Sequence, residues 1–318
     1  MSGIRVGVAG TGKMGFLHCS KLIQMKNVNF IGVYDKDFQR AAQISKSFHV
    51  KAFDSYSELL KNIDAVIIAA PTTFHFSLVA EAVMKNKHVF VEKPMTMTLE
   101  EADKIKKLLK NKRLKFQVGH IERFNPAIQR IHEYIQPDQI INIDAKRLAY
   151  SDRIKDTDVV LDVMIHDIDI ILSLIKSPIK RVSAEGIRLR DSDKFDTVSA
   201  LLLFENGIVA NLMASNISHE KVREFIVYEK EKVIKTNYLM RQQQLIMKEL
   251  NDHHLTFLVG TENVIANITL PYSDPLLEEL RHFVDCIDSD SEPLVGVDEG
   301  RAAVEVALKI KQCLIDSK

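Results

Sequence analysis

The stretch VGVAGTGKMG, residues 6–15, places three glycines in the spacing G-x-G-x-x-G between an apolar run and a segment with helical periodicity. In such a turn Gly10 allows the chain to bend tightly, and Gly12 lets the backbone approach a pyrophosphate. Gly15 lets the following helix pack closely on the strand. Because a helix N-terminus attracts anions, the stretch predicts a dinucleotide-binding turn.

A carboxylate that follows the next strand indicates which dinucleotide binds. Asp35 ends the strand-like run FIGVYD and lies 20 residues beyond Gly15. A carboxylate there can accept hydrogen bonds from both ribose hydroxyls of the adenosine and would repel a 2′-phosphate. We therefore expect NAD rather than NADP. The adjacent Lys36 could offset part of that repulsion, so the strictness of the preference stays open.

Up to residue 120, short apolar runs alternate with helical segments. This alternation is typical of a parallel sheet covered by helices on both faces, and it predicts a doubly wound Rossmann domain over residues 1–120. The expected strands are 4–9, 30–35, 64–70, 88–92 and 115–119, and the expected helices are 14–25, 37–48, 74–86 and 98–111.

Beyond residue 120 strands dominate. The pattern predicts an α+β domain over residues 121–318, built on an open, mostly antiparallel sheet. Because the first domain is a doubly wound Rossmann domain, the chain as a whole is assigned to the α/β class. The expected strands are 140–149, 180–190, 196–205, 207–217, 222–236 and 254–269, and the expected helices are 126–136, 160–176, 275–289 and 298–315.

The composition excludes several classes of protein. Lys and Arg together number 43, as do Asp and Glu, so a net charge of zero offers no attraction to nucleic acid. No apolar run approaches the ~20 residues that span a bilayer, and the N-terminus lacks a signal-peptide pattern. Cys19, Cys286 and Cys313 are scattered, as in proteins of a reducing compartment. We expect a cytoplasmic protein without nucleic-acid or membrane partners.

The segment LDVMIHDIDIILSLIK, residues 161–176, is an apolar helix with one polar stripe: Asp162, His166, Asp169 and Ser173. Buried carboxylates are costly unless they are paired, so the stripe must face partners or a wet cleft. The stripe could line an active site. Alternatively, His166 could be a core histidine whose hydrogen bonds are satisfied, with an acidic residue near the helix start that the helix dipole favours. Asp-x-x-x-His supplies only two ligands, so no metal site is expected. Asp167 lies off the stripe, where we expect it to contact a neighbouring loop.

A second polar feature ends a buried strand. In VFVEKP, residues 89–94, Glu92 and Lys93 follow apolar residues and precede Pro94. By itself this pattern could be a solvated turn. The carboxyl edge of a parallel sheet is also where α/β folds bind their ligands.

Taken together, GTGKMG, Asp35, EKP and LDVMIHDID, in this order and spacing, resemble the Gfo/Idh/MocA oxidoreductases over essentially the whole chain. The resemblance implies a dehydrogenase in which Lys93, Asp162 and His166 gather around the nicotinamide of NAD and the substrate alcohol. It assigns residues 121–318 to substrate binding and oligomerisation. The cofactor-binding residues that it implies are Gly10, Thr11, Gly12, Lys13, Met14, Gly15, Asp35, Ala70, Pro71, His75, Glu92 and Lys93.

The chemistry of an alcohol dehydrogenase suits these residues. A hydroxyl proton must leave the substrate while hydride leaves carbon for the nicotinamide. His166, with an unperturbed pKa of ~6.5, suits a general base, and Asp162 could orient it or bind the substrate. Lys93 can stabilise the developing alkoxide or accept the proton itself. The sequence does not decide between Lys93 and His166.

Two stretches, VGHIERFNPAI (118–128) and SDRIKDTDVVLDVMIHDIDIIL (151–172), resemble the branch of this family that oxidises C3 of UDP-N-acetylglucosamine for the diamino sugars of lipid A. Where many members carry Gly-Gly, this chain has DVV at 158–160. The cations available for a diphosphate are Arg123, Lys146, Arg147, Arg153 and Lys155. The substrate-binding residues implied are Arg123, Asn125, Arg153, Asp162 and His166.

Other activities stay open at this point. The alternatives are a dehydrogenase of free sugars or inositol, and a non-catalytic NAD-binding regulator. The uncovered face of an open sheet usually needs a partner, and members of the family often pair through it. A homodimer or homotetramer that binds a small-molecule substrate is therefore expected.

Overall fold

A computed structural model of the chain describes residues 3–151, 157–190, 194–247, 257–259 and 264–316. It contains two compact units, which are considered one at a time. The first comprises Met1–Ile121 and Asp274–Val304, and the second comprises Glu122–Ser273 and Glu305–Lys318. The sequence-based boundary at residue 120 does not anticipate this return of the chain to the first unit.

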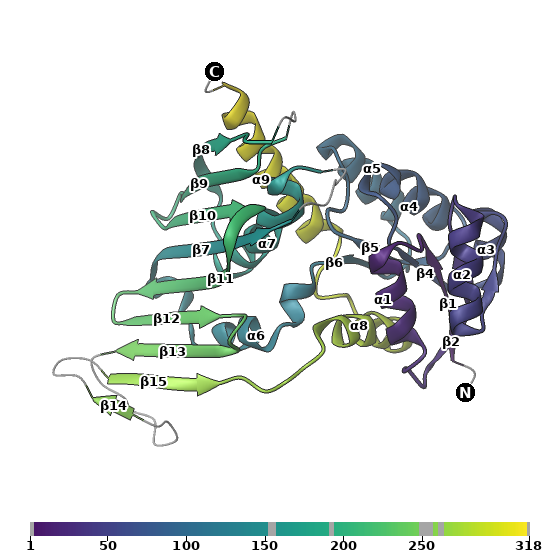
Figure 1. Ribbon diagram of the computed structural model, residues 1–318, viewed down its shortest axis with the longest axis horizontal. Coiled ribbons are helices and arrows are strands. Elements are labelled where there is room, and N and C mark those ends of the chain that lie inside the picture. The colour runs from purple at the N-terminus through teal and green to yellow at the C-terminus, as the bar shows by residue number, and fades with distance from the viewer. Residues whose placement is uncertain (1–2, 152–156, 191–193, 248–256, 260–263, 317–318) are drawn as a thin grey trace. The chain divides into compact units, whose positions relative to one another are not determined.

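The first unit is built on a parallel sheet with the strand order β3-β2-β1-β4-β5-β6 (Figure 1). This confirms the predicted doubly wound sheet. The short β3 and the helix α3 were not predicted, because two and seven residues carry too little periodicity. The strands are β1 (Ile4–Ala9), β2 (Val28–Tyr34), β3 (Lys51–Ala52), β4 (Ala65–Ile68), β5 (His88–Glu92) and β6 (Phe116–Gly119).

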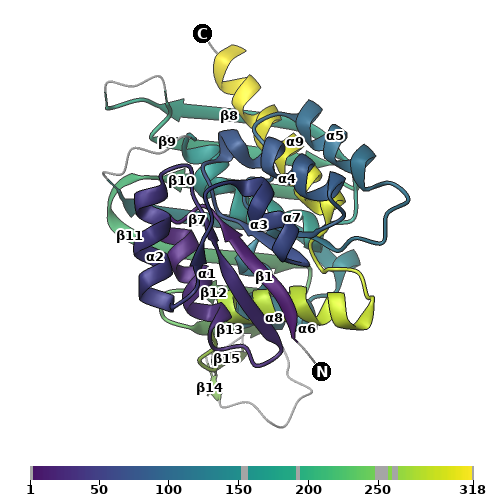
Figure 2. The same cartoon turned by 90° about the vertical axis from the view of Figure 1, so that its right-hand side faces the viewer.

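Helices cover both faces of this sheet (Figure 2). On one face α1, α2 and α8 share a core with the strands through side chains such as Leu22, Ile44 and Phe283. The other face carries α3, α4 and α5. The bounds are α1 (Lys13–Leu22), α2 (Phe38–Phe48), α3 (Tyr56–Asn62), η1 (Thr72–Phe74), α4 (His75–Met84), α5 (Leu99–Leu109) and α8 (Pro275–Ser289).

Capping side chains set where these helices begin. Thr98 and Glu101 form a capping box at α5, in which each side chain accepts the backbone N–H of the other. Asp37 Oδ1 accepts the N–H of Gln39 at 3.1 Å at the start of α2. Each such cap contributes about 1 kcal/mol, enough to fix the first turn of a short helix.

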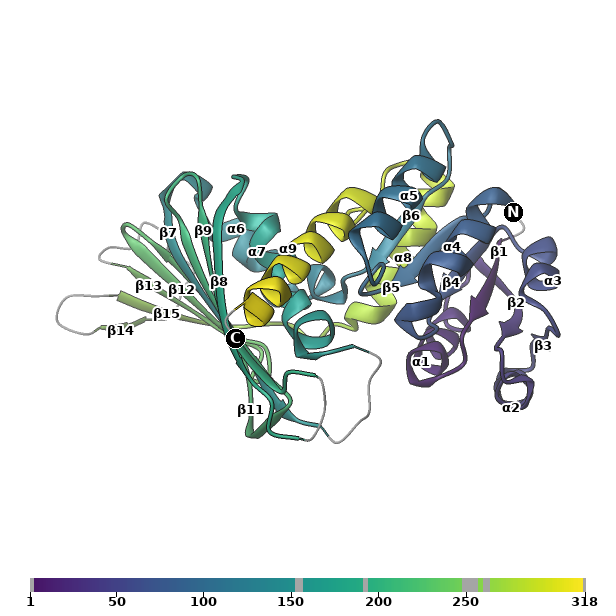
Figure 3. The ribbon, with the colours of Figure 1, turned by 90° about the horizontal axis from the view of Figure 1, so that it is seen from above.

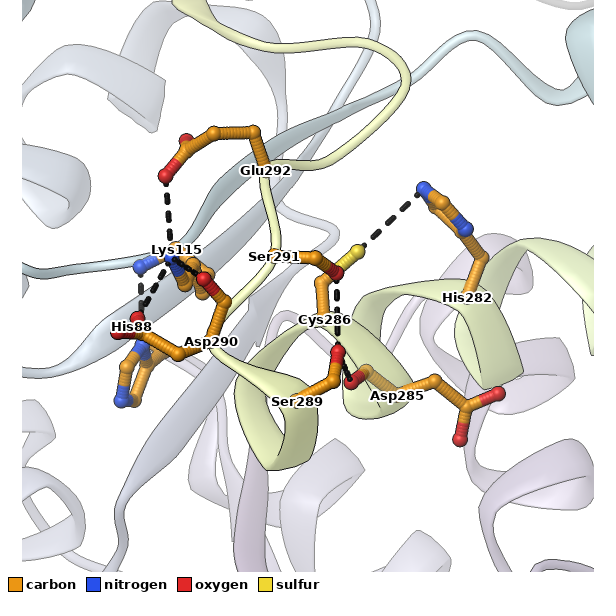
Figure 4. Close-up of polar contacts among 9 residues, drawn as sticks. All are labelled: His88, Lys115, His282, Asp285, Cys286, Ser289, Asp290, Ser291 and Glu292. Atoms are coloured by element: carbon orange, nitrogen blue, oxygen red, sulfur yellow. Dashed lines mark hydrogen bonds and ion pairs between the residues drawn. The ribbon is translucent and has the colours of Figure 1, made fainter.

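Lys115, in front of β6, ties that strand to the turn that follows α8 (Figure 4). Its ammonium lies 2.9 Å from Asp290 Oδ1 and 3.0 Å from Glu292 Oε1, and it donates to the Asp290 carbonyl at 3.1 Å. The hydrogen bond with Asp290 raises the pKa of Lys115, which keeps the ammonium charged. These contacts help to hold the returning segment on the first unit.

The second unit is built on a sheet with the strand order β14-β15-β13-β12-β11-β7-β10-β9-β8. The neighbouring strands β7 and β10 run parallel and the other pairs antiparallel, as predicted for an open, mostly antiparallel sheet. The predicted strand 222–236 is wrong, since a turn after Glu229 divides it. The strand predicted at 254–269 lies partly outside the described residues. The strands are β7 (Ile140–Tyr150), β8 (Ile179–Ile187), β9 (Thr197–Phe204), β10 (Val209–Ser215), β11 (Ile217–Glu229), β12 (Lys232–Asn237), β13 (Gln242–Met247), β14 (Phe257–Val259) and β15 (Val264–Thr269).

The helices α6 and α7 lie on one face of this second sheet (Figure 3). Strand alternation turns Val198 and Leu202 of β9 toward that face, where they are buried, and turns Ser199 and Leu201 the other way. No helix among the described residues of this unit covers the second face. The remaining elements are η2 (Ile121–Phe124), α6 (Pro126–Tyr134), η3 (Pro137–Gln139), η4 (Val160–Met164), α7 (Ile165–Leu174) and α9 (Val297–Asp316).

None of the helices in the described part of the chain has both the length and the apolarity needed to cross a membrane.

Candidate active site

The glycine-rich turn of the first unit has the geometry that its sequence predicts. Gly10 has a φ of +96° and donates its N–H to Tyr34 O at 2.8 Å. A Cβ on Gly15 would lie 1.9 Å from Gly10 O, so α1 can pack this closely only without a side chain there. Glycine is therefore required at both positions by the path of the chain.

The turn is open where a phosphate would bind. Gly12 precedes the first residue of α1, no side chain caps that helix, and the first turn holds no acidic residue. A Cβ on Gly12 would meet no atom within 4 Å. Open space in front of backbone N–H groups and a helix N-terminus fits the pyrophosphate of a dinucleotide, which Gly10, Thr11, Gly12, Lys13, Met14 and Gly15 would hold.

Asp35, which follows β2, is directed toward this turn. Its Oδ2 accepts the N–H of Thr11 at 2.6 Å and the hydroxyl of Thr11 at 2.8 Å. Its Oδ1 accepts the N–H of Asp37 at 2.9 Å. The carboxylate is half-buried and fixed beside the glycine-rich turn, at the end of the strand where a ribose binds in doubly wound folds. The ammonium of Lys36 lies over the ring of Phe74, 5.6 Å from its centroid.

Glu92 and Lys93 differ in environment although they are adjacent. Glu92 is buried, and its Oε1 lies 2.7 Å from Nε2 of His18 on α1. Burial opposes the charge of Glu92, but the His18 hydrogen bond and the charges of His18, Lys93 and His75 lower its pKa overall. Lys93 is half-buried and precedes Pro94 through a cis peptide bond. Glu92 is thus an interior anion, and Lys93 is the partly accessible member of the pair.

His75, at the start of α4, is buried beside the loops after β4 and β5. Its Nδ1 lies 2.8 Å from Pro94 O, and its Nε2 lies 2.9 Å from Ala70 O. Ala70 is half-buried and Pro71 is exposed. The structure brings His75, Ala70 and Pro94 together within the first unit.

In the second unit Asp162 and His166 occupy the junction of a π-helical turn with an α-helix. The N–H of Ile165 donates to Val160 O, which is a π-type bond. Single π-helical turns of this kind are frequent at functional sites. Asp162 and His166 are half-buried, whereas Asp169 and Ser173 further along the stripe are buried. Only the N-terminal part of the predicted polar stripe is therefore accessible.

The deeper part of the stripe meets side chains of its own unit. Arg123 Nη1 lies 3.9 Å from Asp169 Oδ1, and the side chain of Arg123 is only 9% exposed. Ser173 donates its hydroxyl to Ile170 O at 2.6 Å and lies 3.3 Å from Nε2 of His132.

A buried ionic network supports the helix that carries His166. Arg147 of β7 donates from Nη2 to Asp167 Oδ1 at 2.8 Å, from Nε to Asp167 Oδ2 at 3.1 Å and from Nη1 to Glu122 Oε1 at 2.8 Å. Asn125 donates to Glu122 Oε2 at 2.9 Å and accepts the N–H of Ala127, which caps α6. Burial opposes the charge of Glu122, but Arg147 lowers its pKa overall.

Two expectations about these residues are wrong. Asp167 contacts a strand rather than a loop. Arg147 is not available for a diphosphate, because it is buried with two carboxylates of its own, while Lys146 is exposed on the opposite face of the sheet. Strand alternation could have shown this, since Arg147 has the parity of the buried Ile143 and Ala145. Arg153 and Lys155 lie outside the described residues.

Among the residues that the structure describes, no group of three or more His, Cys, Asp or Glu side chains could hold a metal ion.

Comparison with known proteins identifies the family. The sequence matches the oxidoreductase family with an NAD-binding Rossmann fold over residues 4–120 and the GFO/IDH/MocA C-terminal domain over residues 134–235. It is 30% identical over 311 residues to UDP-N-acetylglucosamine 3-dehydrogenase from Acidithiobacillus ferrooxidans, covering 97% of this chain and 96% of that protein. The chain belongs to the Gfo/Idh/MocA oxidoreductase family.

Other members of the Gfo/Idh/MocA family are also similar. The scyllo-inositol 2-dehydrogenase (NAD(+)) of Bacillus subtilis is 26% identical over 333 residues, covering 96% of this chain and 92% of that protein. A solved structure of UDP-N-acetylglucosamine 3-dehydrogenase from Acidithiobacillus ferrooxidans superimposes with a TM-score of 0.90 at 29% identity, covering 99% of this chain and 98% of the other. The chain is thus an oxidoreductase with a domain for a nicotinamide dinucleotide, and named relatives are dehydrogenases of sugars and polyols.

Proposed function

We propose that the protein is an NAD-dependent dehydrogenase that oxidises the C3 hydroxyl of UDP-N-acetylglucosamine to the 3-keto sugar. The observation that carries the proposal is the 30% identity to a UDP-N-acetylglucosamine 3-dehydrogenase across 97% of this chain. The stretches at 118–128 and 151–172 support it from the sequence. In the cytoplasm such a product would supply the amination step that makes the diamino sugar of lipid A.

NAD is proposed over NADP because of Asp35. Its carboxylate is fixed by Thr11 and Asp37 beside the glycine-rich turn, where it would repel a 2′-phosphate. Lys36, the neighbouring cation, lies over Phe74. The proposed cofactor-binding set includes the turn residues, Asp35, Ala70, Pro71 and Lys93, with His75 and Glu92 acting from the interior.

Lys93, Asp162 and His166 are proposed to act on the same secondary alcohol. NAD, when bound, would supply the hydride acceptor at C4 of its nicotinamide. His166 removes the hydroxyl proton as the general base, and Asp162, four residues earlier, orients the imidazole or the substrate. Lys93 stabilises the negative charge that develops on oxygen, or takes the proton in place of His166. The partial exposure of all three residues within their own units supports these roles.

Arg123, Asn125 and Arg153 are proposed to bind the substrate together with Asp162 and His166. Asn125 uses one amide N–H for Glu122 and one carbonyl lone pair for Ala127. An amide has two of each, so a second N–H and a second lone pair suit a sugar hydroxyl. Arginine binds a diphosphate through paired N–H groups, which is the role proposed for Arg153.

The proposal is tested by incubating the protein with NAD and UDP-N-acetylglucosamine and following NADH absorbance in the near ultraviolet. Production of NADH together with a 3-keto sugar is expected. Turnover of free sugars or inositol without turnover of the nucleotide sugar would instead establish the second candidate, a polyol dehydrogenase, which the similarity to the inositol dehydrogenase favours. Cofactor binding without turnover of any of these alcohols would indicate a non-catalytic regulator.

The uncovered face of the second sheet is proposed to pair two copies of the chain, as a homodimer or within a homotetramer. Half-buried apolar residues such as Leu201, Leu203 and Met213 line it between polar neighbours. A sheet face with this composition is stabilised when a second surface covers it.

A further inference from the structure

Both ring nitrogens of His75 face carbonyl oxygens. Nδ1 lies 2.8 Å from Pro94 O, and Nε2 lies 2.9 Å from Ala70 O. Both distances are ordinary for a hydrogen bond from nitrogen to oxygen. The ring is 1% exposed, so water does not compete for either nitrogen.

A carbonyl oxygen only accepts hydrogen bonds, so each contact requires a proton on the facing nitrogen. A neutral imidazole carries one N–H and would hold the lone pair of its other nitrogen against a carbonyl lone pair. The imidazolium carries two N–H groups and satisfies both contacts. The geometry therefore selects the charged ring.

The surroundings provide a counter-charge for a buried imidazolium. Glu92 is ionised within the same region, and the charge of His75 is among the causes that lower the pKa of Glu92. The other titratable groups that act on Glu92 are His18 of α1, through the 2.7 Å contact, and Lys93. A buried charge is tolerated when such a partner is close and its hydrogen bonds are satisfied.

The two carbonyls belong to the loops that the proposed function places at the cofactor. Ala70 follows β4 and Pro94 follows β5, and these strands are neighbours in the parallel sheet. Ligands of doubly wound sheets bind at this carboxyl edge. A side chain that joins the two loops fixes their separation, and with it the backbone that carries Lys93.

We propose that His75 is a positioning residue that acts as a doubly protonated clasp, holding the loops after β4 and β5 in the arrangement that binds the nicotinamide cofactor. The proposal refines the role of His75 in the proposed function, because His75 acts through Ala70 and Pro94 from the interior. The clasp is complete at low pH and loses one of its two carbonyl contacts as the pH rises and the ring gives up a proton. Affinity for the cofactor is then expected to fall with rising pH.

The protonation state is tested by nitrogen NMR of the full chain labelled with ¹³C and ¹⁵N, with the His75 ring signals assigned in the wild type by correlation to its backbone resonances. Both ring nitrogens of His75 are expected to carry protons at neutral pH. His88 and His282 are internal controls from the same unit (Figure 4). His88 Nδ1 accepts the N–H of Lys115 and His282 Nε2 accepts the N–H of Leu294, each at 2.9 Å, and burial lowers the pKa of both rings. Each control should show one bare nitrogen, and a bare nitrogen on His75 at neutral pH would overturn the proposal.

The function of the clasp is tested by NADH binding across a pH series, followed by fluorescence, for the wild type and His75→Gln. The wild type is expected to bind roughly tenfold more weakly once the ring is neutral, which corresponds to the loss of one hydrogen bond to a charged group. Glutamine carries its N–H donors on one nitrogen and cannot span both carbonyls as the imidazolium does, so the variant should bind weakly at every pH. The same pH profile in both proteins would refute the clasp. If the variant does not fold, the NMR result on the wild type decides the question. No sugar enters either measurement, so neither depends on the identity of the substrate.

Discussion

Nε2 of His18 lies 2.7 Å from Oε1 of Glu92, and both side chains are buried in the first unit. One residue comes from the helix that follows the glycine-rich turn, and the other ends the strand that leads to Lys93. The pair therefore connects the helix proposed to bind the pyrophosphate to the segment that carries the proposed catalytic lysine. The rings of His18 and Phe90 also pack in a T-shaped arrangement, with their centroids 5.3 Å apart.

Substitution of His18 by alanine should destabilise the protein by about 3–5 kcal/mol, because it leaves the Glu92 carboxylate buried without its hydrogen-bond donor. The pKa of Glu92 is lowered in the folded chain. The stability advantage of the wild type over His18→Ala should therefore be complete above the pKa of Glu92 in the unfolded chain, ~4.3. That advantage should vanish as the pH falls through the lower folded value. Urea unfolding at several pH values measures this, with His18→Gln as a control that keeps a donor. Equal stability of wild type and His18→Ala at neutral pH would contradict the assigned role of the pair.

The stability of the protein should be equally sensitive to substitution of Arg147. Arg147→Met removes the buried cation that contacts both Glu122 and Asp167, and a loss of about 3–5 kcal/mol is expected from urea unfolding. Lys146→Met is the matched control, since the exposed neighbour lies on the other face of the same strand and should change stability by less than about 0.5 kcal/mol. Similar losses for the two variants would show that the network does not distinguish Arg147 from a surface charge.

Local patterns predicted both sheets and most of the helices. The segment 275–289 was predicted to be helical and is helical, yet the sequence did not show that it covers the first sheet, because packing partners are not encoded in periodicity. The helix predicted at 160–176 begins with a π-helical turn at 160–164, which the sequence does not distinguish, since an apolar run looks the same for both hydrogen-bond spacings.

The polar interior was the least predictable part. Glu122 and Asp167 lie 25 and 20 residues from Arg147 in the chain, so no local pattern connects them. The burial of His18 does have a local signal, because His18 lies three residues after Gly15 and four before Leu22, both buried on α1. The roles proposed for the catalytic residues rest on the family resemblance, and they stay predictions.

Asp35 is expected to control the choice between NAD and NADP. Asp35→Ser removes the charge that repels a 2′-phosphate, and the ratio of NADPH to NADH dissociation constants should fall by about tenfold or more. The ratio is the informative quantity, because loss of the Thr11 contacts should weaken both cofactors alike. Asp37→Ser, which keeps a capping side chain on α2, should leave the ratio unchanged. An unaltered ratio in Asp35→Ser would remove the argument for NAD.

The proposed oligomer predicts a response to charge on the uncovered face of the second sheet. Leu201→Arg places a cation among the half-buried apolar residues of that face, and the molar mass from light scattering should fall to that of a smaller assembly. Met84→Arg, at an exposed apolar position at the end of α4, should leave the mass unchanged. A wild type that is already monomeric would rule out pairing through this face.

Lys93 should separate cofactor binding from chemistry. Lys93→Ala removes the cation proposed to stabilise the alkoxide or to take its proton, so turnover of the proposed nucleotide-sugar substrate should fall by about 10²–10⁴-fold. NADH affinity should change only slightly, because the glycine-rich turn and Asp35, which are proposed to hold the pyrophosphate and the ribose, stay in place. Lys36→Ala, which removes the neighbouring ribose-side cation over Phe74, is the control and should keep its turnover. The comparison uses kcat at saturating NAD, so that a loss of affinity is not mistaken for a loss of chemistry. Undiminished kcat in Lys93→Ala would exclude the lysine from both proposed roles and leave His166 as the remaining candidate for proton transfer.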